Sequence, residues 1–359
     1  MCNSSRGVSG IAVVIAVTLA CASNAQQQTS PPVVKMTAVN QATVNQPQYT
    51  EVDVPLLKQG LPQKSGGRID VTLATWTERN VNGPEVIRLV RSGTVDMGTA
   101  PLNTVSGDVP LLDVADLAGL NPTVEQARRV ATAVVPDANK ALERFNVRIV
   151  GTFAYTAQVL FCREPVASLA AIQGKRVRTG GGSINDFVNA IGAQAVGIGL
   201  PEVYTALERG TVDCAITGTG TGNNVKWYEV TKGLYNLTIN WSTAAYFVNL
   251  AWWNKLDPSL RSLIESTMKE VEDRQWKLAD DLTAGGIACN IGDAAKCKGG
   301  TLVEKNPMTL HQPIAADQDK VRTVLAQTIL PTWLKRCGSD CGEIYNRVVA
   351  PISGVRLSN

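Results

Sequence analysis

A repeated segment of thirteen residues constrains the fold of this chain more than any other feature. The first copy, Pro84–Asp96, reads PEVIRLVRSGTVD, and the second copy, Pro201–Asp213, reads PEVYTALERGTVD. Each copy predicts a helix that begins at proline, ends at glycine and leads into a strand. Helices that alternate with strands are typical of α/β folds with mostly parallel sheets. We therefore expect two lobes of similar α/β construction.

The ends of the predicted strands indicate where a ligand would bind. In open α/β sheets, ligands bind beyond the carboxyl ends of the strands. The repeat therefore directs Met97–Ala100, which includes Thr99, and Ala215–Thr217 toward one shared cleft. Trp76 leaves the predicted strand Arg68–Ala74, so we expect it to form an apolar wall of that cleft. A core position is the alternative for this tryptophan.

The stretch from Gly174 to Thr217 predicts half of a carboxylate-binding site. Arg178 ends a short strand, and the glycine turn that follows opens a helix. A guanidinium group can bind a carboxylate with two parallel hydrogen bonds. The free N–H groups of Gly181 and Gly182, with that of Ser183, would support the same anion at the helix start. The alternative is a surface arginine beside a tight turn.

The remaining hydrophobic patterns predict further elements. Proline removes a backbone donor, so we expect interruptions where it falls inside a helix. A long amphipathic helix starts at Asp257-Pro258, and an apolar strand after Asn240 suits a crossing between lobes. The predicted ranges are a helix over Gln46–Lys64 interrupted at Pro55, a strand over Thr94–Thr99, a helix over Val124–Phe145 broken at Pro136, a strand over Trp241–Trp253 and a helix over Leu256–Ala284.

The first 25 residues have the composition of a secretory signal peptide. Arg6 precedes the short apolar run Ile11–Ala20, and small residues lead up to Ala25. Cleavage after Ala25 would leave 33 basic and 31 acidic residues and no basic cluster, which argues against nucleic acid as a partner. Lipoprotein processing at Cys21 is the alternative to simple cleavage.

Six cysteines would remain after this cleavage. An even number of cysteines in an exported protein suggests disulfide bonds. The two pairs that lie close in sequence are favoured, Cys289 with Cys297 and Cys337 with Cys341. Cys162 and Cys214 each lie on a predicted strand, and either a bond or two buried thiols would suit them.

Residues for catalysis, metal binding or cofactor binding are scarce. His311 is the only histidine, and the HExxH, GxSxG and CxxC motifs are absent. Gly218–Asn223 has only part of a dinucleotide-binding pattern, so we expect no cofactor. We name no metal-ligating residue, and the sequence leaves open whether a metal ion accompanies a ligand. An exported α/β enzyme that acts on a small organic acid remains the alternative, with His311 or a carboxylate such as Asp96 as its acid or base.

Several of these segments together resemble the solute-binding subunits of TRAP (tripartite ATP-independent periplasmic) transporters, of the dicarboxylate-binding type. The resemblance covers about residues 33–335. It is carried by Gly174–Arg178, Ile191–Ala193, Pro201–Leu207 and Arg209–Asp213, and Ser65–Arg68, Val95–Gly98 and Pro110–Leu117 also fit.

The resemblance implies a two-lobe periplasmic solute-binding fold with a hinge of crossing strands and a long helix between the lobes. The implied lobes are 33–155 plus 244–283, and 156–243 plus 284–359. The implied function is periplasmic capture of an organic carboxylate and its delivery to a sodium-coupled TRAP permease. A receptor that presents its ligand to a sensor is a further alternative.

The resemblance also assigns roles to single residues and shows departures from the family pattern. Arg178 matches the arginine that pairs with the ligand carboxylate. Gln158 stands where sialic-acid-binding members carry a second arginine, and Thr217 where they carry asparagine. Leu200 lies near the position of an aromatic contact. These departures favour a monocarboxylate with a less polar tail over sialic acid or a short dicarboxylate.

Overall fold

Two mixed β-sheets organise the computed structural model, which describes Gly10 and residues 32–357. The predicted signal peptide, Gly10 apart, and Cys21 therefore lie outside the described residues. The first sheet has the strand order β2-β1-β3-β10-β4, and the second has the order β11-β9-β5-β8-β6-β7. The strands are β1 (Val34–Val39), β2 (Ile69–Ala74), β3 (Met97–Pro101), β4 (Val147–Ala154), β5 (Gln158–Cys162), β6 (Arg176–Thr179), β7 (Gln194–Gly197), β8 (Cys214–Gly218), β9 (Gly233–Asn240), β10 (Thr243–Asn249) and β11 (Thr309–His311).

Both sheets are mixed, because antiparallel pairs accompany the expected parallel ones. Five strand pairs are parallel and four are antiparallel. Every antiparallel pair involves β5 or β10. The chain reaches these two strands by crossing directly from the other sheet, without the returning helix that places strands in parallel. They therefore run against neighbours that are reached through helices.

The two sheets divide the sequence much as the predicted lobes do. All strands of one sheet fall within the ranges predicted for one lobe, apart from Thr243 at the start of β10. The exact lobe boundaries stay a prediction.

Helices surround both sheets, and none in the described part of the chain is long and apolar enough to cross a membrane. Three of the longer stretches contain wider, π-helical turns. The helices are η1 (Gln48–Gly60), α1 (Leu61–Lys64), α2 (Trp76–Arg79), α3 (Gly83–Ser92), α4 (Leu102–Val105), η2 (Pro110–Asp116), α5 (Val124–Leu142), η3 (Glu143–Phe145), η4 (Leu169–Ile172), α6 (Ser183–Ala190), η5 (Leu200–Glu202), α7 (Val203–Glu208), α8 (Thr219–Asn224), η6 (Trp227–Glu229), α9 (Leu250–Lys255), α10 (Pro258–Asn290), α11 (Ala315–Val324), η7 (Leu325–Ile329), α12 (Leu330–Cys337), α13 (Ser339–Ile344), η8 (Tyr345–Val349) and α14 (Ala350–Ser353).

The two expected proline breaks are absent. Pro55 lies inside η1, where π-helical turns with their extra residue accommodate the missing donor and the ring. Pro136 lies inside α5, which continues through it to Leu142. Buried residues on both sides of Pro136, such as Val134 and Ala138, keep this helix packed on the core and outweigh the local preference of proline.

Two predicted strands have other bounds than expected. The strand predicted over Thr94–Thr99 runs from Met97 to Pro101, because the N–H groups of Thr94 and Val95 still bond to the Leu89 carbonyl at the end of α3. The strand predicted over Trp241–Trp253 ends at Asn249. The Asn249 side chain accepts a hydrogen bond from the Trp252 N–H at 2.9 Å and begins α9.

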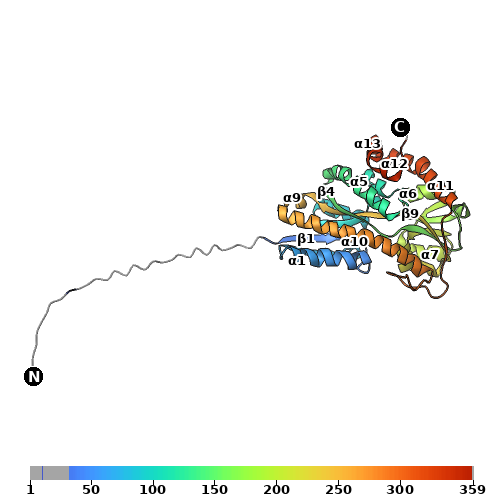
Figure 1. Ribbon diagram of the computed structural model, residues 1–359, viewed down its shortest axis with the longest axis horizontal. Coiled ribbons are helices and arrows are strands. Elements are labelled where there is room, and N and C mark those ends of the chain that lie inside the picture. Colours follow the sequence, from blue (N-terminus) through green and yellow to red (C-terminus); the bar gives the residue numbers. More distant parts are fainter. Residues whose placement is uncertain (1–9, 11–31, 358–359) are drawn as a thin grey trace, which may run out of the picture. The chain divides into compact units, whose positions relative to one another are not determined.

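The long helix α10 contacts elements of both sheets (Figure 1). It begins at Asp257, whose carboxylate accepts the N–H groups of Ser259 and Leu260, as the sequence predicted. Near its middle, the Glu272 carboxylate accepts the Thr152 N–H of β4 at 3.0 Å. At its end, the Asn290 amide donates to the carbonyl of Thr219 in α8 at 3.1 Å.

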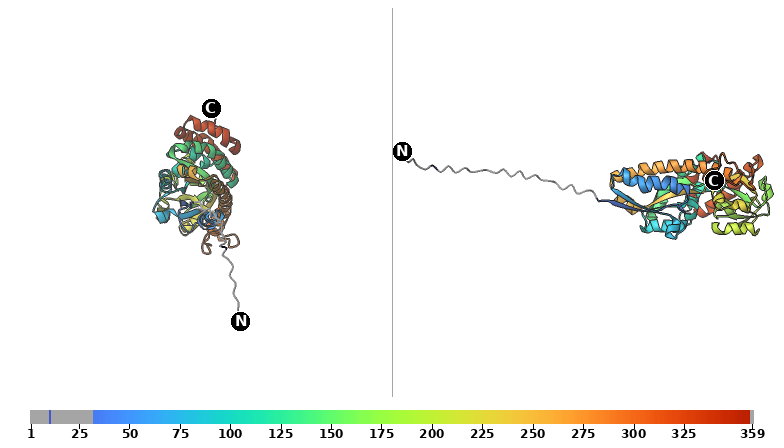
Figure 2. Two further views of the ribbon diagram at one scale, coloured as in Figure 1. Left: turned by 90° about the vertical axis from the view of Figure 1, so that its left-hand side faces the viewer. Right: turned by 90° about the horizontal axis from the view of Figure 1, so that it is seen from below.

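The C-terminal helices pack beside α5, as Figures 1 and 2 show in red and teal. The Trp333 indole donates to the Pro110 carbonyl at 3.0 Å, and Arg347 pairs with Asp137 of α5 at 2.8 Å. Trp333 is fully buried. This segment therefore belongs to the core of the fold.

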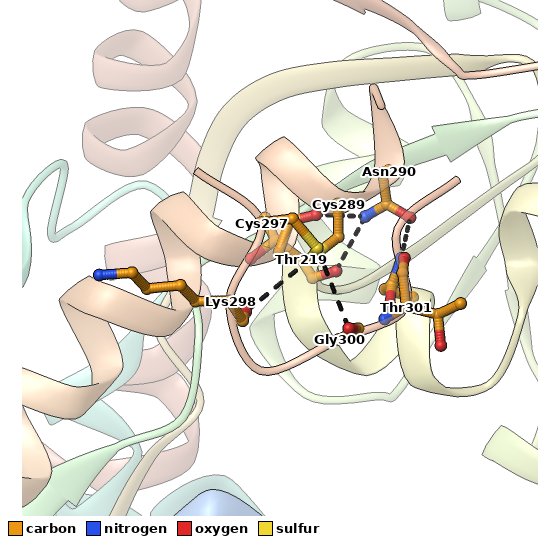
Figure 3. The surroundings of a disulfide bond; sticks show 9 residues. Thr219, Cys289, Asn290, Cys297, Lys298, Gly300 and Thr301 are labelled. Carbon is orange, nitrogen blue, oxygen red and sulfur yellow. Dashed lines mark hydrogen bonds between the residues drawn. A yellow bond between two sulfur atoms is a disulfide. The ribbon is translucent and has the colours of Figure 1, made fainter. Parts of the chain in front are cut away.

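Three disulfide bonds link the six cysteines of the described chain: Cys162–Cys214, Cys289–Cys297 and Cys337–Cys341. Cys162 and Cys214 lie directly opposite one another on β5 and β8. Figure 3 shows the Cys289–Cys297 bond, which joins the end of α10 to the loop that contains Thr301. The Thr301 N–H donates to the Asn223 side chain of α8, so this loop is tied to the second sheet.

Candidate functional site

A cavity of about 180 Å³ lies where strand ends from both sheets meet. Four of the predicted site residues line it: Trp76, Gln158, Leu200 and Thr217. None of its twelve lining residues carries a charge. The other eight are Ala42, Gln46, Pro101, Tyr155, Thr156, Gly218, Thr221 and Ser242.

Trp76 forms one wall of the cavity, and Thr99 supports it from behind. Trp76 is the first residue of α2, where the Thr75 side chain caps the helix. Its indole N–H donates to the Thr99 carbonyl oxygen at 3.1 Å. The Thr99 hydroxyl accepts the Gln41 N–H at 2.8 Å, and Thr99 is fully buried. Thr99 therefore holds the tryptophan in place and does not itself line the cavity.

Gln158 and Thr217 come from neighbouring strands of the second sheet. Gln158 begins β5 opposite Gly218 of β8, and Thr217 lies opposite Val159. The side chain of Gln158 is half-buried, whereas Thr217 is only 6% exposed. Gln158, at the start of β5, and Thr217, near the end of the antiparallel β8, thus reach the cavity from the same edge of the sheet.

Arg178 is buried beside this cavity with two backbone carbonyls as its partners. Its Nε donates to Ile198 at 2.8 Å and its Nη1 donates to Ile216 at 3.0 Å. Ile216 directly precedes Thr217, and Ile198 lies two residues before Leu200, so the guanidinium is anchored to two segments that line the cavity. No carboxylate of the described residues lies within ion-pair distance of it. Burial lowers the pKa of Arg178 to about 10.

The glycine turn after Arg178 has the backbone that the sequence suggested, but it does not line the cavity. Gly181 and Gly182 have φ angles of +103° and +61°, which favour glycine. Ser183 begins α6, and its hydroxyl accepts the Ala118 N–H at 3.0 Å. The structure thus groups four predicted residues at the cavity, places Arg178 next to them, and leaves Gly181 and Gly182 outside the lining.

Five polar lining residues were not expected from the sequence. Thr221 lies in α8, the short helix that the glycine-rich stretch after β8 forms. Tyr155, Thr156 and Ser242 lie on the short connections between the sheets, and Gln46 lies just before η1. The signal for Tyr155, Thr156 and Ser242 is their place on the segments that join the two predicted lobes, since such segments border the cleft.

The acid–base candidates of the enzyme alternative do not line the cavity. The Asp96 carboxylate accepts both the N–H and the hydroxyl of Thr37, at 2.7 and 2.8 Å. His311 ends the edge strand β11. Within residues 32–357, no cluster of three or more His, Cys, Asp or Glu side chains is arranged to hold a metal ion.

A larger cavity of about 410 Å³ lies between β9 and the C-terminal helices. Its lining contains none of the predicted site residues, and its only charged side chain, Arg322, already pairs with Asp319. The smaller cavity therefore remains the candidate site, because the buried cation and the strand ends converge there.

Comparison with known proteins places the chain among bacterial solute receptors. Residues 38–310 match the family model for the bacterial extracellular solute-binding proteins, family 7. The 2,3-diketo-L-gulonate-binding periplasmic protein YiaO of Escherichia coli is 27% identical over 200 residues, which cover 55% of this chain and 61% of that protein. The sialic acid-binding periplasmic protein SiaP of Vibrio cholerae is 22% identical over 236 residues, 65% of this chain and 73% of that protein. The chain thus matches about three-fifths of the length of the first of these relatives.

Solved structures share the fold over nearly the whole chain. A TRAP periplasmic solute-binding protein of Ochrobactrum anthropi has a TM-score of 0.77 and 22% identity, with 90% of this chain and 97% of that chain covered. A Bordetella pertussis extracytoplasmic solute receptor that binds pyroglutamic acid has a TM-score of 0.73 and 18% identity, with 87% and 98% covered. These matches confirm the expected two-lobe fold. Since the family model also spans well over half of the chain, this protein belongs to family 7 of the bacterial extracellular solute-binding proteins, the TRAP-type receptors.

Proposed function

We propose that the protein is an extracytoplasmic receptor that binds a singly charged organic acid in the cavity and delivers it to a sodium-coupled TRAP permease. One observation carries the proposal: Arg178 is buried next to an uncharged cavity, and among the described residues its partners are two backbone carbonyls and the Trp227 ring, 6.0 Å away, with no carboxylate. A buried cation without a counter-charge is costly, and a carboxylate would relieve that cost through charge-assisted hydrogen bonds.

The residues that line the cavity favour a ligand with one carboxylate and further groups that form hydrogen bonds. A second carboxylate would find no second cation, because Gln158 stands where a second arginine would be needed. The sequence favoured a less polar tail, but seven of the twelve lining residues carry a hydroxyl, phenol or amide group, which favours a ligand with polar atoms of its own. Trp76 offers one flat apolar face for the body of the ligand.

The relatives bind acids of this general kind. The E. coli relative is named for 2,3-diketo-L-gulonate, the Bordetella receptor binds pyroglutamic acid, and a Sulfitobacter relative of the same fold holds β-D-galacturonate. Each of these ligands has one carboxylate and a polar body, which supports the ligand class but leaves the individual acid to experiment.

A thermal-shift screen tests the ligand class. The screen would contain pyroglutamate, galacturonate and 2,3-diketogulonate, together with the neutral amide of pyroglutamate and a short dicarboxylate. An acid present at about 1,000 times its dissociation constant should stabilise the fold by about 4 kcal/mol. The amide should have little effect. Stabilisation by the amide equal to that by its acid would contradict the role of Arg178.

Arg178→Ala tests the proposed anchor. We expect the variant to fold and to bind the acid found in the screen more weakly by about 2–5 kcal/mol. Arg176→Met is the matched control, because Arg176 lies two residues away on the same strand and already pairs with Asp213 at 2.8 Å. Equal losses in both variants would refute a specific role for Arg178.

Two further parts of the proposal can be tested: the acid is bound without being converted, and the protein is exported to the periplasm. Mass spectrometry of the bound acid after long incubation should return it unchanged, and a converted product would favour the enzyme alternative. N-terminal sequencing of protein from the periplasmic fraction should begin after Ala25. A lipid-modified Cys21 would instead indicate membrane anchoring.

A further inference from the structure

Two short crossovers carry the chain between the sheets, and both contribute to the cavity wall. The first crossover, Tyr155–Ala157, joins β4 to β5, and the second crossover, Trp241–Ser242, joins β9 to β10. Tyr155, Thr156 and Ser242 line the cavity. The geometry of each crossover therefore influences both the relation of the sheets and the shape of the site.

A single carboxylate holds the second crossover. Asp116, at the end of η2, accepts the Trp241 N–H at 2.9 Å and the Thr243 N–H at 3.0 Å. It also accepts the Asn240 side-chain amide at 2.8 Å and the Thr243 hydroxyl at 3.2 Å. Asp116 is only 2% exposed, so water cannot readily replace these four bonds.

The residue enclosed by these bonds has an unfavourable backbone conformation. Ser242 has a φ of +50°, a region that residues other than glycine rarely adopt. The N–H groups on either side of it, those of Trp241 and Thr243, both point to the Asp116 carboxylate. The carboxylate thus compensates for the strain and fixes the position of Ser242 in the cavity wall.

The first crossover has a different and weaker attachment. The Tyr155 hydroxyl donates to the Gln41 side-chain carbonyl at 2.9 Å, and the Ala157 N–H donates to the Thr283 hydroxyl at 3.0 Å. The Ala157 carbonyl also accepts the Thr219 N–H at 3.1 Å, and none of these three bonds involves an ionised group. Burial raises the pKa of Asp116 to about 7, and above that pH the second crossover is held by four bonds to a charged group, which are stronger than bonds between neutral groups.

We infer that Asp116 is a positioning residue for the binding site: it fixes the second crossover, and through Ser242 the cavity wall, and so sets ligand affinity without touching the ligand. The inference rests on the proposed function for its effect on affinity. Its effect on the crossover itself does not depend on any ligand, which allows the two to be tested separately.

Asp116→Asn is the main variant, because it keeps the size of the side chain but replaces one acceptor oxygen with an amide that cannot accept. The first measurement is hydrogen–deuterium exchange of the ligand-free protein at about pH 8, above the Asp116 pKa, which burial raises to about 7. We expect the Trp241 and Thr243 amides to exchange about tenfold faster or more, and the amides near Asn249 to be unchanged. Unchanged exchange at Trp241 and Thr243 would overturn the inference.

The second measurement is calorimetric titration with pyroglutamate and galacturonate at a temperature where the variants are folded. For either acid that binds the unmodified protein, Asp116→Asn should weaken binding by about tenfold or more. Asn249→Ala is the matched control, because it removes a buried bond to Val90 at the other end of β10. It should lower stability and leave affinity within about twofold. Equal affinity of Asp116→Asn and the unmodified protein would overturn the inference.

Failure of the proposed function would look different. If neither acid binds the unmodified protein, the proposed ligand class is in question, while the exchange measurement still decides the role of Asp116. If Asp116→Asn does not fold, Thr243→Val removes one of the four bonds only. It should then give a smaller increase in exchange at Thr243 and a smaller loss of affinity, and no change in either quantity would count against the inference.

Discussion

The two copies of the repeat build the same local frame from the same residues. Each helix is followed within two residues by a glycine with positive φ, +75° at Gly93 and +70° at Gly210. Each following aspartate then binds the preceding parallel strand. The Asp96 carboxylate accepts the Thr37 N–H at 2.7 Å, and the Asp213 carboxylate accepts the Arg176 N–H at 2.9 Å. The Gly-Thr-Val-Asp sequence therefore encodes a helix-to-strand turn and its attachment to the neighbouring strand.

The copies differ in what surrounds that frame. In the first copy, Gly98 lies so close to α3 that a Cβ atom would be 2.4 Å from a methyl carbon of Val86, whereas the second copy has Ala215 at the matching position. The second copy alone is joined to a neighbouring strand by a disulfide, at Cys214. The strands of both copies reach the cavity wall, β3 with the apolar Pro101 and β8 with the polar Thr217 and with Gly218. The repeat thus specifies the frame, and the neighbouring elements decide what each copy contributes to the site.

Among the changes that test this difference between the copies, removal of the Cys162–Cys214 bond should lower the stability most. With both residues changed to alanine, the second copy would have no cross-link, like the first. The bond closes 52 residues, and its loss should lower the free energy of unfolding by about 4 kcal/mol. Urea unfolding of protein produced in an oxidising compartment measures the change.

The matched control for this prediction is the double alanine variant of Cys337 and Cys341. That bond spans only four residues in sequence, so a smaller loss of about 2 kcal/mol is expected. A larger loss at Cys337–Cys341 than at Cys162–Cys214 would contradict the expectation that the bond closing the longer loop stabilises the fold more.

Gly98→Ala should have an intermediate effect. The added methyl group would clash with the side chains of Val86 and Val90, and these can move away only if α3 shifts. We therefore expect the free energy of unfolding to fall by about 1–3 kcal/mol. Val86→Ala in the same chain should recover part of that loss by making room. If the double variant is no more stable than the sum of the single losses predicts, the close approach of α3 is not the cause.

The reverse change in the second copy provides the contrast. Ala215→Gly removes a methyl group from the buried middle of β8 and should cost about 0.5–1 kcal/mol through backbone entropy, with a further small loss of packing. Thermal unfolding of the two single variants under the same conditions compares the copies directly.

Asp213→Asn should have the smallest effect, and a distinctive pH dependence. The hydrogen bond from Arg176 holds the pKa of Asp213 below its ordinary value. A lowered folded-state pKa stabilises the protein above the unfolded-state value of about 4, and this contribution disappears as the pH falls through the folded-state value. Because the pair is largely exposed, we expect a loss below about 1 kcal/mol near neutral pH.

Unfolding measured as a function of pH checks this last prediction. The difference between Asp213→Asn and the unmodified protein should be constant from neutral pH down to about 5 and should shrink below about 4. Arg176→Met should give a similar profile, because it removes the same pair. A difference that grows at low pH would contradict the assigned sign.

Local patterns in the sequence predicted most of the helices and strands, but few of the features that depend on tertiary packing. The repeat, the start of α10 at Asp257 and the strands that carry Gln158 and Thr217 all follow from short-range signals. The continuous helices at Pro55 and Pro136 do not, because packing outweighs the preference of proline there. A local pattern also cannot predict that the sheets are mixed, since the direction of a strand depends on how the chain crosses between the sheets.

The sequence pointed to the charge of the candidate site more directly than to its shape. The strand end before a glycine turn drew out Arg178 as a candidate, and the family resemblance assigned its role as the partner of a carboxylate, which stays a prediction. The polar wall formed by Tyr155, Thr156 and Ser242 does not, because nothing in their own sequence distinguishes these crossover residues from ordinary loop residues. Only the convergence of two sheets makes them neighbours of Trp76.

The attachment of α10 to both sheets limits how the molecule can change shape. Gln275 donates to the Gln48 carbonyl beside the first sheet at 3.0 Å, and the Thr283 carbonyl accepts the Thr219 hydroxyl beside the second sheet at 3.1 Å. At Gly286 the helix lies so close to α8 that a Cβ atom would be 2.6 Å from the backbone nitrogen of Gly220. A rotation of one sheet relative to the other would therefore have to bend this helix between Gln275 and Thr283 or break one of its attachments, and both outcomes cost free energy.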